Sequence, residues 1–539
     1  MPETTVFVRR ASGLVRAWSL FDGFIYAFFS VNLVTLGLYI FSFAPYIPQG
    51  HLVPAIVIST IFILFEIVVY SMLISVMPRA GGDYVWQSRL LGGGIGFVLC
   101  MVGWVFILWH WVPVYGTILA YQVLTPILLV LGSAIGSTAL IDAAFWFTTE
   151  HGLFIASLLV IATATAVVSL GMKGYARVQK FCFFVAMGGL LLGVVALLVG
   201  TKTAFMQHFD AWVTSIIHVD PGAYQRILSQ AAEMGYSPIP WNKMVVAGSL
   251  PLIPMVVFWN LWPNWGATLY GEVQGAGEFK RNFWSMTAGL LGASGIAIIL
   301  LALFNKTFGW DFYLASAFAF YEGIEGMPVF PYPGLFIALL NKNVIWQLLI
   351  LLSWSAWFFG WCGTVFLSST RVAFAAAFDR VLPEWIAYVS PKTRAPVNAL
   401  LVMSVGALVV SVLYSYLPGF ATCTLDTTLA IALTYFGTTI AGILLPYKDP
   451  LLYNSSPVSR YKIFGLPWIT VAGVIFGGFL IYNFVLWIKD DVYGINNPIS
   501  AVYMGALYLL AIGIYYSSKV VRKKQGISLD VVYKNIPVE

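Results

Sequence analysis

Residues 53–77 read VPAIVISTIFILFEIVVYSMLISVM, an apolar run in which Glu66 is the only charged side chain. A helix that crosses a bilayer needs about 20 mostly apolar residues, so this run is long enough to span one. Runs of similar length recur from Trp18 to Tyr516 with short polar connections. We therefore expect the bilayer to be the solvent for most of the chain.

The composition supports a membrane protein and excludes a soluble domain. Of the 539 residues, 60% are hydrophobic and 9% are charged, whereas soluble domains have about 25% charged residues. The first sixteen residues are polar and basic, so we expect no cleaved signal peptide. The four cysteines stand singly without metal-ligand spacing, which predicts small core residues and no metal or other cofactor.

The apolar runs predict about twelve helical spans. They cover Trp18 to Phe41, Val53 to Met77, Ile95 to Leu124, Leu153 to Leu170, Val178 to Val199, Met244 to Tyr270, Phe283 to Phe304, Val344 to Ala377, Val397 to Tyr416, Thr427 to Pro446, Trp468 to Ile488 and Ala501 to Tyr516. The third and eighth runs are too long to cross upright, so we expect tilted or projecting helices.

The orientation follows from the lysines and arginines, because cytoplasmic loops hold an excess of them. With twelve spans, most of the 28 lysines and arginines fall on the side of the two termini. We therefore expect a multi-pass protein of the cell membrane with both termini in the cytoplasm. The net charge of +6 then reflects this bias and indicates no nucleic acid partner.

Four short motifs, in order along the chain, point to a known family. They are Met77-Pro78-Arg79-Ala80-Gly81-Gly82-Asp83-Tyr84-Val85, Gly271-Glu272-Val273, Ser368-Ser369-Thr370-Arg371 with Asp379-Arg380-Val381-Leu382-Pro383, and Thr393-Arg394-Ala395-Pro396-Val397-Asn398. In the first motif, proline and paired glycines end a helix and arginine anchors it at the interface. With these motifs, the chain resembles the amino acid permeases of the amino acid-polyamine-organocation (APC) superfamily.

The resemblance implies an all-α polytopic fold of the leucine-transporter (LeuT) type, with two inverted repeats of five helices and two further helices. The implied organisation is a cytoplasmic segment (1–16), a first repeat (17–200), an extracytoplasmic loop (201–243), a second repeat (244–446), peripheral helices (447–517) and a cytoplasmic tail (518–539). A short helix over 225–234 is expected in the loop, as a lid or a passive cap.

In such a fold the first and sixth spans are broken near the bilayer midplane, where freed backbone groups bind the substrate. Pro263 predicts the second break, because proline lacks an N–H and clashes with a preceding carbonyl. The alternative is an ordinary proline kink packed by neighbours. In the first span the family's glycine-serine-glycine turn falls on Asn32-Leu33-Val34, so both glycines are missing. The candidate substrate-binding residues are Phe29, Ser30, Val31, Asn32, Phe258, Trp259, Asn260, Leu261 and Trp262.

Aromatic residues surround both predicted breaks, and they suit an apolar side chain or an organic cation. Further tryptophans occur on the third and eighth spans, at Trp109, Trp111, Trp354 and Trp357. The alternative is that most of these rings face lipid or fill helix contacts.

Coupling to a proton or ion has its own candidates. An ionisable group inside a span is costly in lipid and marks a pathway, which makes Glu66 a candidate proton carrier. His110 is a second candidate, and the hydroxyls of Thr364, Ser368 and Ser369 are candidate sodium ligands. For each, a purely structural hydrogen-bonding role is the alternative.

We therefore predict a secondary active transporter of amino acids or related organic amines, working by alternating access and driven by a proton or sodium gradient. The chain has no GxxxxGK[ST] loop, which argues against coupling to ATP. It also has no clustered carboxylates or nucleophile motif, which argues against an enzyme. A transporter-like sensor or a channel is the alternative function. The expected partners are the small-molecule substrate, membrane lipid and H⁺ or Na⁺.

Overall fold

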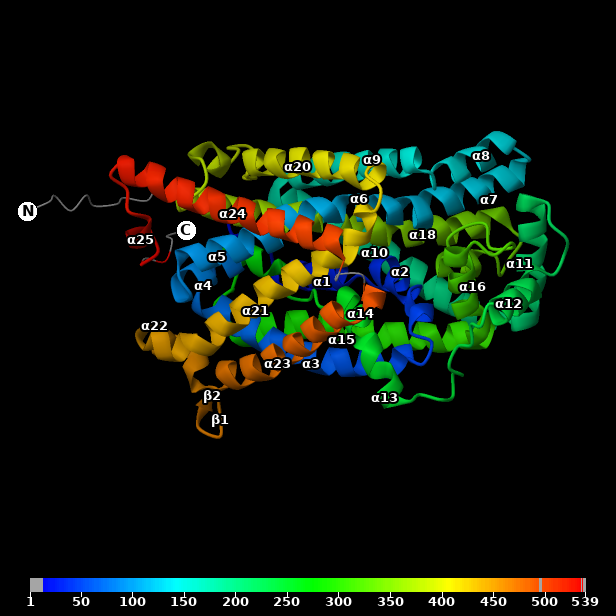
Figure 1. The fold of residues 1–539 in the computed structure, drawn as a ribbon, viewed down its shortest axis with the longest axis horizontal. Helices are drawn as coiled ribbons and strands as arrows, with labels where there is room; N and C mark the ends of the chain where they lie inside the picture. Colours follow the sequence, from blue (N-terminus) through cyan, green and yellow to red (C-terminus); the bar gives the residue numbers. More distant parts are fainter. Residues whose placement is uncertain (1–12, 494–496, 535, 537–539) are drawn as a thin grey trace, which may run out of the picture.

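The computed structural model describes residues 13–493, 497–534 and 536, which form one elongated bundle of helices (Figure 1). Within that part of the chain, twelve helical segments are long and apolar enough to cross a membrane. The strands β1 (Lys462–Ile463) and β2 (Leu466–Pro467) pair as a small antiparallel hairpin. The all-α polytopic fold predicted from the sequence is confirmed.

The twelve segments contain both single and composite helices. They comprise α1 (Leu20–Val31), η1 (Leu33–Gly37) and α2 (Leu38–Phe41); α3 (Leu52–Val76); α5 (Gly93–Met101), η3 (Val102–Phe106), α6 (Ile107–Leu119), η4 (Ala120–Leu124) and α7 (Thr125–Ile135); α9 (Glu150–Ser169); α10 (Gly171–Val199); α13 (Val246–Ser249), η5 (Leu250–Leu252), α14 (Ile253–Asn260) and η6 (Trp265–Glu272); α15 (Phe279–Thr307); α18 (Val344–Trp361) and α19 (Thr364–Phe378); α20 (Val397–Tyr416); η8 (Phe420–Cys423) and α21 (Thr424–Lys448); α23 (Trp468–Lys489); and α24 (Pro498–Lys524).

Shorter elements connect these segments at the two ends of the bundle. They are η2 (Ala44–Tyr46), α4 (Gly82–Leu90), α8 (Thr138–Trp146), α11 (Lys202–Ile217), α12 (Ala223–Glu233), α16 (Trp310–Glu322), α17 (Pro333–Ala338), η7 (Glu384–Ala387), α22 (Pro450–Ser455), η9 (Pro457–Arg460), η10 (Asp491–Tyr493) and α25 (Leu529–Val532). Figure 1 places α4, α22 and α25 at one end, here called the α4 end, and α8, α11 and α12 at the opposite end, the α12 end.

The third span is longer than its sequence indicates. The sequence predicts an end at Leu124, but the helix continues through Pro126 to Ile135. Pro126 lies in the first turn of α7, directly after the π-helical turn η4. A local π-helical turn can re-satisfy the backbone groups that a proline leaves unpaired, so the helix passes through Pro126. Gly136, with φ of +65°, ends the helix instead.

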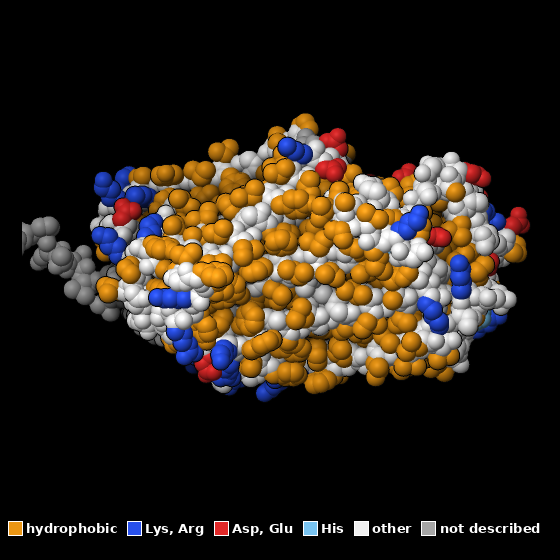
Figure 2. All heavy atoms as spheres, turned by 90° about the horizontal axis from the view of Figure 1, so that it is seen from below, with side chains coloured by type: hydrophobic (Ala, Val, Ile, Leu, Met, Phe, Trp, Pro, Cys, Tyr) orange, Lys and Arg blue, Asp and Glu red, His pale blue; other side chains and the backbone are white. Residues whose placement is uncertain are grey.

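On the face shown in Figure 2, apolar side chains cover the length of the bundle, and most charged side chains lie towards its two ends. Leu191, Leu509 and Val502 are among the large apolar residues exposed on the protein surface. Such a continuous apolar belt is unfavourable in water and favourable against lipid chains. The protein is thus an integral, multi-pass membrane protein.

Candidate functional site

The first span is broken at a single residue. Asn32 takes the left-handed conformation with φ of +36°, between α1 and the π-helical turn η1. Its Oδ1 accepts a hydrogen bond from the Thr35 N–H at 3.1 Å, and its Nδ2 donates to the Trp357 carbonyl at 3.2 Å. Asparagine tolerates this conformation better than most residues. The chain therefore makes the break with an asparagine where the resemblance implies glycine.

The sixth span is interrupted at the position that Pro263 predicts. Helix α14 ends at Asn260, the next four residues are not helical, and the 3₁₀ helix η6 begins at Trp265. The Trp265 N–H donates to the Trp262 carbonyl at 3.1 Å, which tightens the chain as it leaves the break. Backbone of this kind is tolerated at membrane depth only inside protein or beside a cavity.

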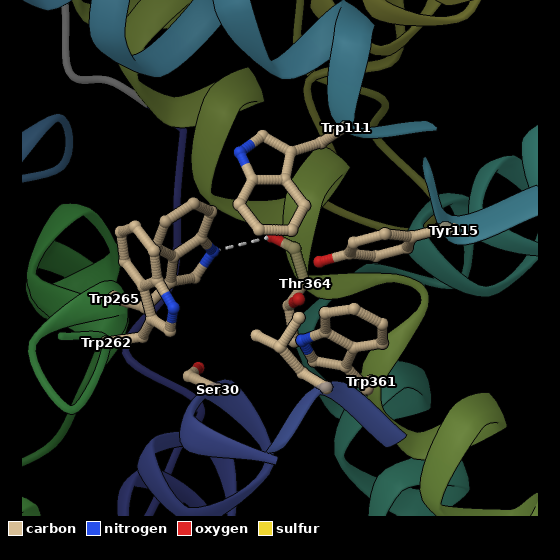
Figure 3. A pocket seen from close by; sticks show the side chains of 8 residues that line it. Ser30, Trp111, Tyr115, Trp262, Trp265, Trp361 and Thr364 are labelled. Carbon is tan, nitrogen blue, oxygen red and sulfur yellow. Dashed lines mark hydrogen bonds between the residues drawn. The ribbon is translucent and has the colours of Figure 1, made fainter. Parts of the chain in front are cut away.

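A small cavity adjoins both breaks (Figure 3). Its volume is about 10 Å³, which is room for about one water molecule. It is lined by Ser30, Leu36, Trp111, Tyr115, Trp262, Trp265, Trp361 and Thr364. Figure 3 shows the indole of Trp265 donating to the Thr364 carbonyl, at 3.2 Å. An amino acid fits here only if the surrounding rings move.

The rings around this cavity contact one another. The Trp262 ring meets Trp111 edge-on at 6.0 Å and Trp265 at 5.3 Å between centroids. Across the cavity, Tyr115 and Trp361 are stacked at 3.7 Å. Faces of electron-rich rings attract organic cations, and their carbon surface suits apolar groups. The lining is therefore chemically suited to an amine or an apolar side chain.

Only some of the predicted binding residues line the cavity. Ser30 and Trp262 do, and the Ser30 hydroxyl donates to the Tyr26 carbonyl at 2.7 Å. The others point elsewhere because successive helical residues face different directions. Phe29 packs against Trp357, and Trp259 packs against Phe41. Asn260 donates a hydrogen bond to the Ser59 hydroxyl at 2.8 Å. Val31 is buried, and Leu261 lies in the break.

Three aromatic lining residues were absent from the sequence-based candidates. Tyr115 and Trp361 each lie one helical turn after a tryptophan that the sequence singles out, Trp111 and Trp357 respectively. Residues four apart share a helix face, so this spacing was the available signal. Trp265 is the third, two residues after Pro263.

The hydroxyl candidates for ion binding have different surroundings. Thr364 lines the cavity, and the Ser368 hydroxyl lies 2.7 Å from the Tyr26 hydroxyl and donates to the Trp265 carbonyl at 3.0 Å. These residues join α1, η6 and α19 beside the cavity. The Ser369 hydroxyl instead donates to the Val365 carbonyl within its own helix.

His110 and Glu66 lie away from the cavity. The His110 ring is buried against Tyr414, Phe420 and Tyr503, although its neighbour Trp111 lines the cavity. Glu66 is completely buried on α3, and neither carboxylate oxygen has a hydrogen-bond partner among the described residues.

A larger cavity lies on the α12 side of the breaks. Its volume is about 290 Å³, and its lining includes Tyr39, Phe43, Tyr414 and Phe258. Phe258 also packs against Trp111 of the small cavity, at 5.2 Å between centroids. The Phe258 ring therefore stands between the two cavities.

On the α4 side the bundle is closed by ion pairs. The guanidinium of Arg371 holds the carboxylate of Glu272 with an Nε–Oε1 distance of 2.8 Å, and both side chains are buried. Nearby, Arg89 of α4 pairs with Asp379 at 2.6 Å. These contacts join η6 to the middle of α19 and α4 to its C-cap residue, Asp379.

The chain matches the sequence model of a known family. The sequence model of the family described as Amino acid permease matches residues 21–512. This range covers both interrupted helices and every residue that lines the small cavity. No curated protein matches the chain.

Proposed function

Because the chain belongs to the amino acid permease family, we propose that it is a secondary transporter of amino acids or related organic amines, working by alternating access around the cavity between its two interrupted helices. Family membership points to a transporter rather than an enzyme. The observation that carries the proposal is the meeting of both breaks at one cavity. Two inverted repeats, 17–200 and 244–446, would place the breaks in corresponding helices.

The two sides of the cavity support the alternating-access proposal. The α12 side carries a cavity of about 290 Å³ behind Phe258, and the α4 side is closed by buried ion pairs. A transporter in such a state admits substrate from the α12 side and releases it after the α4 side opens. We assign the α4 end to the cytoplasm, because most lysines and arginines lie in its loops.

The substrate is expected to combine an amine with an apolar or aromatic side chain. The aromatic lining favours such groups. The carboxylate site is expected to differ from a glycine-lined turn, because Asn32 already uses its Oδ1 and Nδ2 within the protein. Its backbone is less open to a close approach than that of glycine.

A two-step experiment tests this function. Thermal shift of the purified protein is measured against the amino acids and a series of organic amines, with and without sodium. The compound with the largest shift is then used, in labelled form, for counterflow into proteoliposomes preloaded with the same unlabelled compound. Counterflow is expected for a transporter. Binding without counterflow would indicate a sensor, and rapid dissipative flux without exchange would indicate a channel.

A further inference from the structure

A cluster of buried polar side chains lies between α3, α4 and α21, apart from the small cavity. The carboxylate of Asp83, the second residue of α4, is its centre. Asp83 Oδ1 accepts hydrogen bonds from the hydroxyls of Tyr70 and Thr438, both at 2.6 Å. Gln87 Nε2 donates to the Thr438 hydroxyl at 2.8 Å. Three helices are thus joined through one carboxylate oxygen.

The cluster also contains acceptors that nothing in the described protein satisfies. Asp83 Oδ2 and both oxygens of Glu66 have no hydrogen-bond partner within residues 13–493, 497–534 and 536. Both side chains are completely buried. Glu66 lies one turn before Tyr70 on α3, and its charge interacts with that of Asp83. An unpaired buried carboxylate is costly, so this pair requires a compensating ligand.

No positive side chain provides that compensation. Among the described residues neither carboxylate has a salt bridge, and two buried arginines pair with other acids: Arg371 with Glu272 and Arg89 with Asp379. The groups shown to interact with the pair, or with its hydrogen-bond partners, are uncharged polar or aromatic residues and one thiol, namely Tyr70, Gln87, Cys100, Trp104, Tyr435 and Thr438.

The buried acid of η6, Glu272, is paired with Arg371, and the long helices packed on α3 add no charge at this level. The charged residues of α15, α21 and α23 lie in their first or last turns, and α14 has none. Two buried carboxylates close to each other, without a cation, cannot both ionise at an acceptable cost.

We propose that Glu66 and Asp83 form a proton-binding pair that holds one exchangeable proton and couples its movement to transport. This inference rests on the proposed transport function and names its coupling ion. The proton adds to a carboxylate oxygen from water on one side of the membrane and leaves to water on the other, with no other bond changed.

Aromatic contacts connect this pair to the substrate cavity. The Tyr435 ring packs against Tyr70 at 5.5 Å and against Trp262 at 6.2 Å between centroids. Asn264, in the break of the sixth span, is completely buried beside the Tyr435 hydroxyl. Movement of Trp262 on substrate binding would therefore disturb the surroundings of Glu66 and Asp83. Coupling requires that the contacts around the proton site differ between the substrate-bound and substrate-free states, and this movement would supply such a difference.

Two features favour a proton over a sodium ion. Sodium needs several oxygen ligands with free lone pairs, but Tyr70 and Thr438 direct their O–H groups at Asp83. In addition, burial raises the pKa of Asp83 to about 6, although the hydrogen bonds from Thr438 and Tyr70 oppose this rise. A group with that pKa gains and loses its proton near physiological pH.

A cavity at the α4 end borders the short helix that carries Asp83. Its volume is about 410 Å³, and it is lined by Met77, Ser88 and Arg89, among others. Ser88 and Arg89 belong to α4, the same short helix as Asp83. We infer that the proton enters and leaves on this side by way of the cavity.

Infrared difference spectroscopy of the reconstituted protein, recorded against pH, tests the pair without any substrate. The carboxylic acid band of Asp83 is identified by its loss in Asp83→Asn. In Glu66→Gln the midpoint of this band is expected to change, because the apparent pKa of a shared proton belongs to both carboxylates and not to Asp83 alone. An unchanged midpoint would show that the two groups titrate independently and would overturn the pair.

A second variant keeps this test valid if Asp83→Asn does not fold. Tyr70→Phe removes one O–H donor to Asp83 Oδ1 and leaves the ring in place. Loss of a donor to the ionised form is expected to raise the pKa of Asp83, so the same band moves to higher pH. A carboxylic acid band whose midpoint does not shift in Tyr70→Phe does not belong to Asp83. Absence of a carboxylic acid band of Asp83 from the wild-type spectra would overturn the proposal.

Proteoliposomes test the coupling with the compound that shows counterflow. Glu66→Gln is expected to retain counterflow and to lose accumulation driven by a pH gradient. Asp426→Asn is the matched control, because Asp426 is another buried carboxylate with unpartnered oxygens, at the other end of α21. Gradient-driven accumulation that survives in Glu66→Gln, or that requires sodium, would overturn the inference. If the wild-type protein shows no counterflow but its infrared band still responds to the Glu66 and Tyr70 variants, the proposed transport function is rejected and the proton-binding pair is retained.

Discussion

Arg371 and Glu272 form a two-point ion pair inside the protein, on the α4 side of the substrate cavity. Arg371 Nε and Nη2 donate to the two carboxylate oxygens of Glu272 at 2.8 and 3.3 Å. Their side chains are 0% and 1% exposed. Glu272 is the last residue of η6, so the pair fixes the far end of the interrupted helix to α19. Opening of the α4 side would separate these two residues.

Glu272→Gln is expected to destabilise the protein strongly. Removal of one partner leaves the Arg371 charge buried and uncompensated, at a cost of about 3–5 kcal/mol. Thermal unfolding in detergent measures the loss. The double variant Glu272→Gln/Arg371→Gln is expected to be more stable than Glu272→Gln alone. Glu278→Gln, which breaks an exposed pair with Arg281, is the control and is expected to change little. A double variant less stable than the single one would contradict this account.

Trp262→Ala is expected to weaken substrate binding about tenfold to a hundredfold. Trp262 lines the cavity and contacts both Trp111 and Trp265. Loss of a large buried contact costs about 1.5–3 kcal/mol, and each 1.4 kcal/mol is a factor of ten. Titration calorimetry with the compound found by thermal shift measures the affinity. Trp284→Ala, on an exposed surface of α15, is the control. Equal affinities in the two variants would remove Trp262 from the site.

The fold could be predicted from the sequence more fully than the site. Apolar run length and the four motifs are local signals, so the twelve spans and the break at Pro263 were predictable. The π-helical turns that carry the third span past Pro126 have no such signal. The orientation of side chains beside a break also depends on packing between helices far apart in sequence. For this reason Trp262 was predicted to line the cavity, whereas Tyr115 and Trp361 were missed.

The buried carboxylates show the same limit. Glu66 could be singled out because it is the only charge in a long apolar run. Asp83 lies in a motif that its proline and glycines already account for as the end of a helix, so the sequence gives no reason to single Asp83 out. Its hydrogen-bond partners Tyr70 and Thr438 come from two other helices. Only the fold brings these residues together.

Replacement of Asn32 tests how the first break is made. Asn32→Gly is expected to be tolerated and to change the substrate profile, because glycine adopts the left-handed conformation freely and exposes the backbone. Both variants lose the cap on Thr35, but Asn32→Ala is expected to be less stable, since alanine, unlike glycine, costs about 1–2 kcal/mol in this conformation. Thermal unfolding compares the two, and competition between amino acids for counterflow measures the profile. An alanine variant as stable as the glycine variant would show that φ of Asn32 is not strained.

The segment after α24 is expected to detach from the α4 end in Gly93→Ala. A Cβ at Gly93 would lie 2.0 Å from the Tyr533 ring, so the ring must move away. That ring also packs on the guanidinium of Arg89, at 5.5 Å. Hydrogen exchange of residues 529–534 is expected to rise in Gly93→Ala and in Tyr533→Ala to a similar degree. Gly505→Ala, where an added Cβ meets nothing within 4 Å, is the control. Unchanged exchange in Gly93→Ala would mean that the segment does not rest on α5 in the membrane.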